Sequence, residues 1–276
     1  MPDTAPAPFL FHQGTAPLLI SMPHAGTHVP PAIAARLTSE ARQVPDTDWH
    51  LPRLYDFAQA LGASILVATH SRYVVDLNRP PDGTSLYPGQ SVTGLCPVDT
   101  FDDRPLYANP ADLPDEAEVA ARRAAYWAPY HAQLRAELER LRAAHGVAVL
   151  WDAHSIRSVL PRFFVGRLPD LNLGTGQGTS CDPVLADELQ AIAKAATGYT
   201  AVLNGRFTGG YITRHYGEPA RNIHAVQLEM TQCSYMQEAL PFAYLPDAAE
   251  RIQPTLQAML RAALVFASAR GAASNG

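Results

Sequence analysis

Apolar runs that stay apolar on both faces constrain the fold of this 276-residue chain more than any other feature. A strand with one face in water alternates apolar and polar residues, whereas a strand buried on both faces does not. The runs that we predict as strands are residues 17–22, 63–69, 72–77, 147–153, 200–204 and 224–230. Several of them, such as PLLISM and VAVLWDA, show no alternation. This pattern predicts a sheet that is covered by helices on both sides.

Amphipathic segments between these runs supply the covering helices. The predicted helices are residues 48–62, 114–146, 182–198 and 245–271. We expect Pro129 to break or kink the second of them. Strands that alternate with helices are typical of α/β folds, in which ligands bind at the carboxyl ends of the strands. The length and the 47% apolar content fit one sizeable domain, so we expect a single domain over residues 1–276.

Charge and composition exclude two classes of partner. The formal net charge is -5 and the isoelectric point is near 6.0, so the chain lacks the basic surplus that binds nucleic acid or an anionic membrane. No signal peptide and no membrane-spanning stretch is predicted. The three cysteines are widely spaced, which fits neither a disulfide framework nor a cysteine-rich zinc site. We expect a cytoplasmic protein with a small-molecule substrate, and the sequence leaves open whether it forms a homo-oligomer.

A glycine-rich run, GTGQG at residues 174–178, could be taken for a phosphate loop. It lacks the GK[ST] ending of such loops. The residues before it, RLPDLNL, make a poor buried strand for a dinucleotide fingerprint. We interpret the run as a flexible loop and expect no nucleotide cofactor.

Three predicted strands carry metal-ligand or acid–base residues at or near their carboxyl ends. His24 follows LLISM, His154 follows VAVLWDA, and Glu229 lies within HAVQLEM. If these strands are parallel neighbours, the three side chains meet in one crevice. Asp46 and Asp48, near the start of the first predicted helix, are candidates for the same crevice.

Two histidines, one carboxylate and an open position for water form a common zinc hydrolase site. His24 and His154, with Asp48 or Asp46, are candidate ligands. Each histidine could instead be a hydrogen-bonded core or surface residue, and Asp48 could be a helix N-cap. Glu229 needs a partner, because a carboxylate inside an apolar strand is desolvated unless the strand lies at an edge. A general base beside a metal ion explains it better.

Two arginine-containing segments supply candidate substrate contacts. In HSRYVVDLNRP, Asp76 is expected to pair with Arg72 or Arg79, and this pair could be purely structural. Asn78 and Arg79 lie where an amide and a guanidinium fork can hold a substrate carboxylate. The later segment NGRFTGGYITRHYG is interpreted as a mobile substrate clamp or as a hairpin turn. Its candidate substrate contacts are Arg206, Thr213 and Arg214.

The chain also contains a series of longer motifs, and their order matches that of a known family. They are SMPHAGTHVP, PDTDWHLPRLYDFA, SRYVVDLNRPP, LYPGQ, TGLCPVDTFDDRPLY, WDAHSIRS, LPDLNLGTGQGTSCDP, NGRFTGGYITRHYG and VQLEMTQCSYM. In these segments the sequence resembles the N-formylglutamate amidohydrolases, also called N-formylglutamate deformylases, of the histidine degradation pathway. The resemblance runs along most of the chain, and so many matched segments make it specific.

The resemblance implies a fold and a set of site residues. The fold would be similar to zinc carboxypeptidases: a central, mostly parallel mixed sheet flanked by helices on both faces, with one divalent metal ion, most simply Zn²⁺, at the strand ends. His24, Asp48 and His154 look like the metal ligands, and Glu229 looks like the catalytic carboxylate. The sequence LNR at residues 77–79 resembles the Asn-Arg pair that binds the substrate carboxylate in related carboxypeptidase-like enzymes.

The implied reaction is metal-dependent hydrolysis of N-formyl-L-glutamate to formate and L-glutamate, the last step of a histidine degradation pathway. Such a substrate has two carboxylates, which would explain arginine forks in an acidic protein. One alternative is an amidohydrolase for another small N-acyl amino acid or for N-formylmaleamate. The other is a carboxylate-binding protein that keeps the fold without turnover. Release of formate discriminates among these hypotheses.

Overall fold

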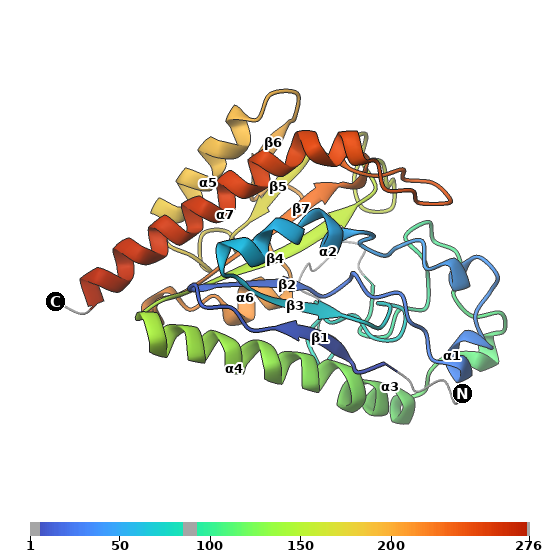
Figure 1. The fold of residues 1–276 in the computed structure, drawn as a ribbon. Helices are drawn as coiled ribbons and strands as arrows, with labels where there is room; N and C mark the ends of the chain where they lie inside the picture. Colours follow the sequence, from blue (N-terminus) through green and yellow to red (C-terminus); the bar gives the residue numbers. More distant parts are fainter. Residues whose placement is uncertain (1–5, 85–92, 275–276) are drawn as a thin grey trace.

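A mixed sheet runs through the centre of the computed structural model, which describes residues 6–84 and 93–274 (Figure 1). Its strands among the described residues are, in spatial order, β1 (Phe9–His12), β3 (Ser64–Ala68), β2 (Leu18–Met22), β4 (Ala148–Ile156), β7 (Ile223–Thr231), β5 (Leu171–Gly174) and β6 (Ala201–Leu203). The central strands β3, β2, β4 and β7 are parallel, while β1 and β5 pair antiparallel with β3 and β7. The predicted α/β domain with a mostly parallel mixed sheet is confirmed.

The three strands expected to carry the site lie side by side, in the order β2, β4, β7. Their register places Ser21 beside Asp152 and His154 beside Glu229. Every residue of β4 and of β7 is buried, which explains why their sequences do not alternate. The carboxyl ends of the three strands therefore form one edge, as predicted.

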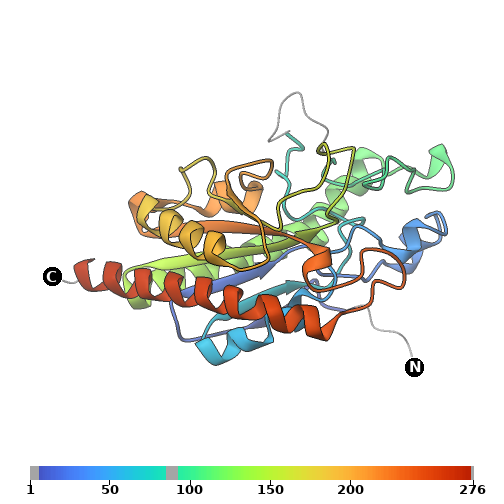
Figure 2. The same cartoon turned by 90° about the horizontal axis from the view of Figure 1, so that it is seen from above.

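Helices cover both faces of the sheet (Figures 1 and 2). Their bounds are α1 (Pro31–Ala34), α2 (Leu51–Leu54), α3 (Glu116–Arg122), α4 (Ala128–His145), α5 (Pro183–Ala195), α6 (Tyr211–Tyr216) and α7 (Pro246–Ser274). Leu18 and Ile20 of β2 pack with α2, α5 and α7, whereas Leu19 packs with α4 and α6. Successive residues of one strand thus enter two different apolar cores. None of the described helices is long and apolar enough to cross a membrane.

The predicted strand at residues 72–77 is wrong, because this segment forms a turn. Val74 N donates to Ser71 O at 2.8 Å, and Arg72 donates to Asp76 Oδ2 at 2.6 Å. In a strand, residues four positions apart are separated by about 13 Å. The turn brings the two buried charges together, and buried charges require such a partner. The charged residues of RYVVDL therefore belong to an ion pair across a turn and not to a strand.

Two strands, β1 and β5, were not predicted. The strand β5 begins inside RLPDLNL, which we interpreted as a poor buried strand, and ends at Gly174, yet all four of its residues are buried. Its polar residue, Asn172, donates from its amide to Glu229 O at 3.1 Å and to Pro169 O at 2.6 Å. A side-chain amide that donates to backbone carbonyls can occupy a buried strand, and this obscured the pattern.

The predicted helices need smaller corrections. The helix expected at residues 48–62 is split into α2 and a 3₁₀ turn at Asp56–Leu61. The long helix continues past Pro129, because a π-helical turn at Arg123–Trp127 joins α3 to α4. The helix expected to end at Gly271 continues to Ser274, and a Cβ on Gly271 would lie 2.4 Å from His145 O. That glycine therefore allows close packing. The LYPGQ motif, residues 86–90, lies outside the described residues.

Candidate active site

Three ligand-type side chains converge at the carboxyl ends of β2 and β4. His24 follows β2, His154 lies in β4, and Asp48 lies in the turn before α2. One ligand atom from each lies within 4.8 Å of the other two, and all three residues are buried. The backbone fixes this arrangement, because Asp48 N donates to His24 O at 3.0 Å and Ser155 N donates to Asp48 Oδ2 at 3.2 Å.

Each histidine has a further carboxylate on the other side of its ring. His24 Nε2 lies 2.7 Å from Asp76 Oδ1, and His154 Nε2 lies 3.1 Å from Asp152 Oδ2. Because a carboxylate can only accept hydrogen bonds, a neutral His24 carries its proton on Nε2 and presents the lone pair of Nδ1, which lies 3.8 Å from Asp48 Oδ2. His154 has further polar contacts: its Nε2 also lies 3.0 Å from Asn78 Nδ2, and its Nδ1 lies 3.1 Å from Asp48 Oδ2. Carboxylates orient metal-binding histidines in this way, so the group can hold a divalent metal ion.

The electrostatics of the group favour a cation. Burial alone would lower the pKa of His154, yet the carboxylates of Asp152 and Asp48 raise this pKa well above its usual value. Burial raises the pKa of Glu229 to about 8, and the same two aspartates act in the same direction. Asp48 and Asp152 therefore place negative charge beside His154 and Glu229, while His154 and Arg72 act in the opposite direction on the pKa of Glu229.

The structure distinguishes Asp48 from Asp46 as a candidate ligand. Asp46 Oδ2 accepts hydrogen bonds from the Tyr73 hydroxyl at 2.6 Å and from Phe101 N at 2.8 Å. Asp48, and not Asp46, belongs to the ligand group. The N-cap interpretation of Asp48 is wrong, since α2 has His50 at its N-cap position and no side-chain cap.

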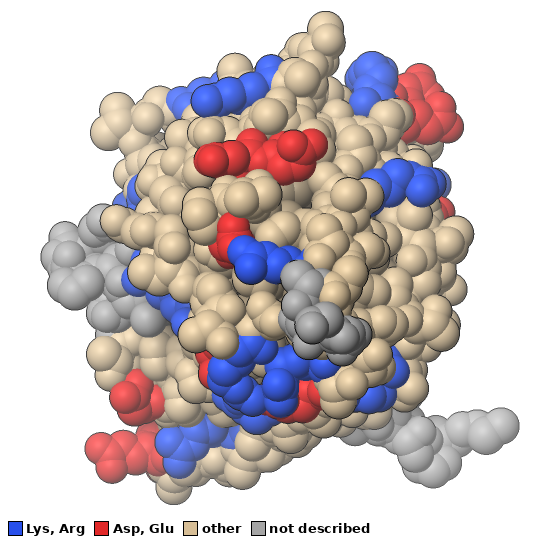
Figure 3. Space-filling view, turned by 90° about the vertical axis from the view of Figure 1, so that its left-hand side faces the viewer, with Lys and Arg blue, Asp and Glu red and all other residues tan. Residues whose placement is uncertain are grey.

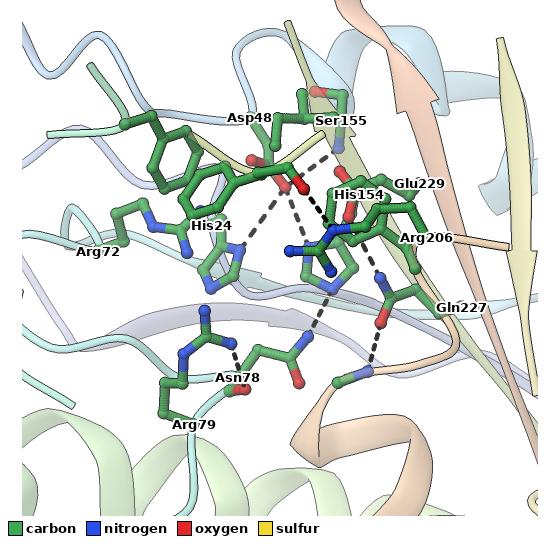
Figure 4. Close-up of a pocket in the computed structure, with 15 residues that line it drawn as sticks. His24, Asp48, Arg72, Asn78, Arg79, His154, Ser155, Arg206, Gln227 and Glu229 are labelled. Atoms are coloured by element: carbon green, nitrogen blue, oxygen red, sulfur yellow. Dashed lines mark hydrogen bonds and ion pairs between the residues drawn. The ribbon is translucent and has the colours of Figure 1, made fainter. Parts of the chain in front are cut away.

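A cavity of about 600 Å³, including its open mouth, lies beside the ligand group (Figure 4). The predicted base, Glu229, lines the cavity together with the following predicted substrate contacts: Arg72, Asn78, Arg79 and Arg206. The remaining lining residues are Phe101, Ser155, Ile156, Phe163, Phe207, Gly210 and Gln227. In Figure 4, Arg72 and Arg79 lie on the side of His24, whereas Arg206 lies on the side of Glu229.

The arginines on the side of His24 are held by the chain itself. Arg72 pairs with Asp76, as predicted for one of the two arginines, and Arg79 Nε lies 3.9 Å from the same carboxylate. Arg79 also donates to Thr93 O at 3.0 Å and to Thr93 Oγ1 at 3.1 Å. Charge from Arg72 holds the pKa of Asp76 well below its usual value in spite of burial.

The opposite wall combines Arg206 with aromatic rings. Arg206 Nε donates to Phe163 O at 2.6 Å, and its guanidinium lies 5.2 Å from the ring centroid of Phe207. Phe101 and Phe163 pack edge to face at 5.0 Å. This side of the cavity thus offers a cation beside apolar surface.

Two predicted substrate contacts, Thr213 and Arg214, do not line the cavity. Their segment is not a hairpin, because it contains the short helix α6, and Arg206 of the same segment lines the cavity. Thr213 is fully buried, and its Oγ1 donates to Asp152 Oδ2 at 3.3 Å. Arg214 donates to Gly209 O at 2.8 Å and to Thr208 Oγ1 at 2.7 Å. Both residues therefore brace the walls of the site.

Some lining residues were missed by the sequence analysis. Gln227 could have been found, because residues two apart on a strand share a face and Glu229 was already a candidate. The aromatic residues Phe101, Phe163 and Phe207 come from loops and carried no periodic signal. Asp152 lies at the end of the predicted strand VAVLWDA, but its role as the partner of His154 was not predicted.

Comparisons with known proteins agree with these observations. A family model described as N-formylglutamate amidohydrolase matches residues 16–236. The N-formylglutamate deformylase of Pseudomonas aeruginosa is 55% identical over 260 residues, which are 94% of this chain and 97% of that protein. The N-formylglutamate deformylase of Pseudomonas putida is 54% identical over the same shares.

Solved structures show the same fold. The crystal structure of an N-formylglutamate amidohydrolase from Ralstonia eutropha matches with a TM-score of 0.79 and 27% identity, over 94% of this chain and 98% of that one. A gene product from Agrobacterium tumefaciens matches with a TM-score of 0.72 over 95% of this chain and 96% of that one. At 20% identity, this second likeness concerns the fold alone.

Proposed function

This chain belongs to the N-formylglutamate amidohydrolase family, and from that premise we propose that it hydrolyses N-formyl-L-glutamate to formate and L-glutamate with the help of one divalent metal ion. The observation that carries the proposal is the shared cavity of about 600 Å³, in which a His, Asp, His group, a buried glutamate and three arginines face one another. These are the parts that hydrolysis of an anionic amide needs.

His24, Asp48 and His154 would hold the ion through two nitrogen atoms and one oxygen atom. Two imidazoles and one carboxylate with a position left for water favour Zn²⁺. A bound divalent ion supplies Lewis-acid chemistry, since it lowers the pKa of nearby water and polarises a carbonyl oxygen. Asp76 and Asp152 would keep both rings in the tautomer that this ligation needs when the ion is bound.

Glu229 acts as the general base and then as the general acid. Its carboxylate takes the proton of the attacking water and passes it to the nitrogen of the leaving glutamate. Burial favours the protonated form of this side chain, so Glu229 can keep the proton between the two transfers. Its register opposite His154 fixes it beside the ligand group.

The arginines bind the two substrate carboxylates. Arg79 and Arg72, with Asn78, hold one carboxylate on the side of His24, and Arg206 holds the other on the opposite side. Thr213 and Arg214 contribute to substrate binding indirectly, because they hold Asp152 and the backbone of Gly209 in place. The formyl group is small, so the cavity needs little space for the acyl part of the substrate.

We also propose a cytoplasmic location and a role in the last step of histidine degradation. The free thiols of Cys96, Cys181 and Cys233 fit a reducing compartment. The pathway follows from the family resemblance and from the glutamate product.

Formate release from purified, metal-loaded protein tests the function. N-formylglutamate is compared with N-formylglutamine, N-acetylglutamate and N-formylmaleamate. The loss of one carboxylate contact in N-formylglutamine should lower kcat/KM by about 10- to 100-fold. Absence of formate from N-formylglutamate would refute the proposal, and faster turnover of another compound would assign the site to that substrate.

Glu229→Gln tests the base. The variant should lose about 10²- to 10⁴-fold in kcat while its metal content stays that of the wild type. Wild-type turnover in this variant would remove Glu229 from the mechanism.

A further inference from the structure

A second polar side chain shares the face of β7 that carries Glu229. Gln227 lies two residues earlier in the strand, so both side chains project to the same side of the sheet. Both line the cavity, and Gln227 is 4% exposed against 7% for Glu229. The side chain of Gln227 forms its hydrogen bonds with Gly210 N and Glu229, not with His24, Asp48 or His154. The proposed reaction gives Gln227 no role.

The carboxamide of Gln227 is held in one orientation. Its Oε1 accepts a hydrogen bond from Gly210 N at 2.7 Å. A carboxamide has one acceptor end and one donor end, so this contact turns Nε2 the other way. There Nε2 donates to Glu229 Oε2 at 3.2 Å (Figure 4). The backbone of Gly210 thereby determines which group faces the glutamate.

Asn78 repeats this arrangement on the other side of the same backbone segment. Its Oδ1 accepts from Ile212 N at 2.8 Å, and its Nδ2 lies 3.0 Å from His154 Nε2 and 3.4 Å from Asp152 Oδ2. A Cβ on Gly210 would lie 2.3 Å from Asn78 Nδ2, so the segment can pass between the two carboxamides only with glycine at this position. The backbone at the start of α6 thus turns the donor end of each carboxamide toward the buried polar side chains of the site.

We propose that Gln227 is a positioning residue for Glu229. Its Nε2–H holds one carboxylate oxygen, Oε2, and leaves Oε1 free to accept the proton of water. A neutral donor can hold a carboxylate in one rotamer and, unlike a cation, does not neutralise its negative charge. The inference rests on the proposed function, because it assumes Glu229 as the base. The competing role is purely structural: Gln227 would hold only Gly210, in the loop that follows Arg206.

Two substitutions separate these roles. Gln227→Met keeps the side-chain length and removes both hydrogen bonds. Gln227→Glu keeps an acceptor for Gly210 N but places a carboxylate where Nε2 donated. If Gln227 positions Glu229, both variants lose about 10- to 100-fold in kcat, with KM within about twofold and metal content unchanged. If Gln227 only holds Gly210, the Glu variant keeps wild-type kcat on the plateau of its pH profile, because a second carboxylate beside Glu229 then only raises the pKa of that base. The Met variant in that case raises KM through the displaced Arg206.

Gln253→Met is the matched control. Gln253 Nε2 donates to Leu54 O at 2.9 Å, between α7 and α2 and away from the cavity, so the same substitution removes one structural hydrogen bond. Its kcat should equal that of the wild type. Thermal unfolding of every variant is followed, and Gln227→Asn, which keeps both amide groups but shortens their reach, replaces Gln227→Met if the latter does not fold.

Losses of kcat in both Gln227 variants support the inference. A loss in only one of them, or values within about threefold of Gln253→Met, overturns it while the proposed function stands. Failure of the proposed function looks different, because the wild type then releases no formate. Wild-type activity of Glu229→Gln overturns the inference as well, since no base would remain to be positioned.

Discussion

The two ends of the central parallel strands use the same charged residue types in opposite settings. At the amino ends, where Arg and Asp or Glu side chains lie side by side on the surface (Figure 3), Arg221 and Arg142 pair with Glu139 at 2.6 and 2.9 Å. These side chains are 35 to 42% exposed. At the carboxyl ends, Arg72 pairs with Asp76 at 2.6 Å with exposures of 7% and 0%. Ion pairs of similar length therefore lie in very different environments at the two ends of the strands.

The difference separates charged side chains that have little effect on stability from charged side chains that are kept for a function. Exposed ion pairs contribute about 0–1 kcal/mol, because water screens them. Buried charges cost several kcal/mol each in desolvation, and the loss of one partner leaves the other uncompensated. The carboxyl-end group combines His24, Asp48, Asp76, Asp152 and Glu229 in one buried region. Such a concentration is explained by chemistry and not by stability.

The largest effect is expected for His154→Ala at the carboxyl ends. This change removes a ligand and leaves Asp152 and Asp48 without their shared partner. Formate release should fall by more than about 100-fold, since even residues behind the ligands are typically worth 10- to 100-fold. Metal analysis by mass spectrometry should find little bound ion. Full metal occupancy would exclude His154 as a ligand.

Asp76→Asn should affect both metal binding and stability. Asparagine keeps an acceptor for His24 but removes the charge that pairs with Arg72. We expect metal affinity to fall by about 10- to 100-fold, and the free energy of unfolding to fall by about 3–5 kcal/mol. Metal titration and urea unfolding measure the two changes. Wild-type values for both would show that the buried pair is dispensable.

Gly210→Ala tests the close packing beside the same group. The added Cβ would meet the Asn78 amide at 2.3 Å, and overpacking of this kind costs about 1–3 kcal/mol. Urea unfolding should show this loss, together with a lower kcat/KM. Gly94→Ala is a suitable control, because its Cβ would meet only Cys96 O, at 3.9 Å. Similar results for both variants would contradict the packing argument.

The smallest effect is expected for Arg142→Ala at the amino ends. It removes the exposed pair with Glu139. The free energy of unfolding should change by less than about 1 kcal/mol, and formate release should not change. A loss as large as that of Asp76→Asn would remove the contrast between the two ends of the strands.

The same contrast explains how much the sequence could predict. His24, His154 and Glu229 were brought together correctly, because strands that lack alternation must lie inside a sheet and parallel neighbours share one edge. Such reasoning depends only on strand order. It did not decide between Asp46 and Asp48, because both lie in the irregular segment before α2.

Features that depend on turns were less predictable. The apolar run RYVVDL was predicted as a strand, although it forms a turn in which Arg72 and Asp76 meet. Thr213 and Arg214 were candidates for substrate contact, but α6 turns them toward Asp152 and Gly209. Loop conformations arise from contacts between distant residues, which local sequence patterns do not record.

Metal dependence is the most direct test of the central claim, that the buried charges at the carboxyl ends hold one divalent ion needed for turnover. The chain is stripped with a chelator and titrated with Zn²⁺, while bound metal and formate release from N-formylglutamate are measured together. The account predicts a single tight site per chain and formate release that rises in proportion to its occupancy, and neither in His154→Ala. Formate release by the metal-free chain at the rate of the loaded chain would contradict it.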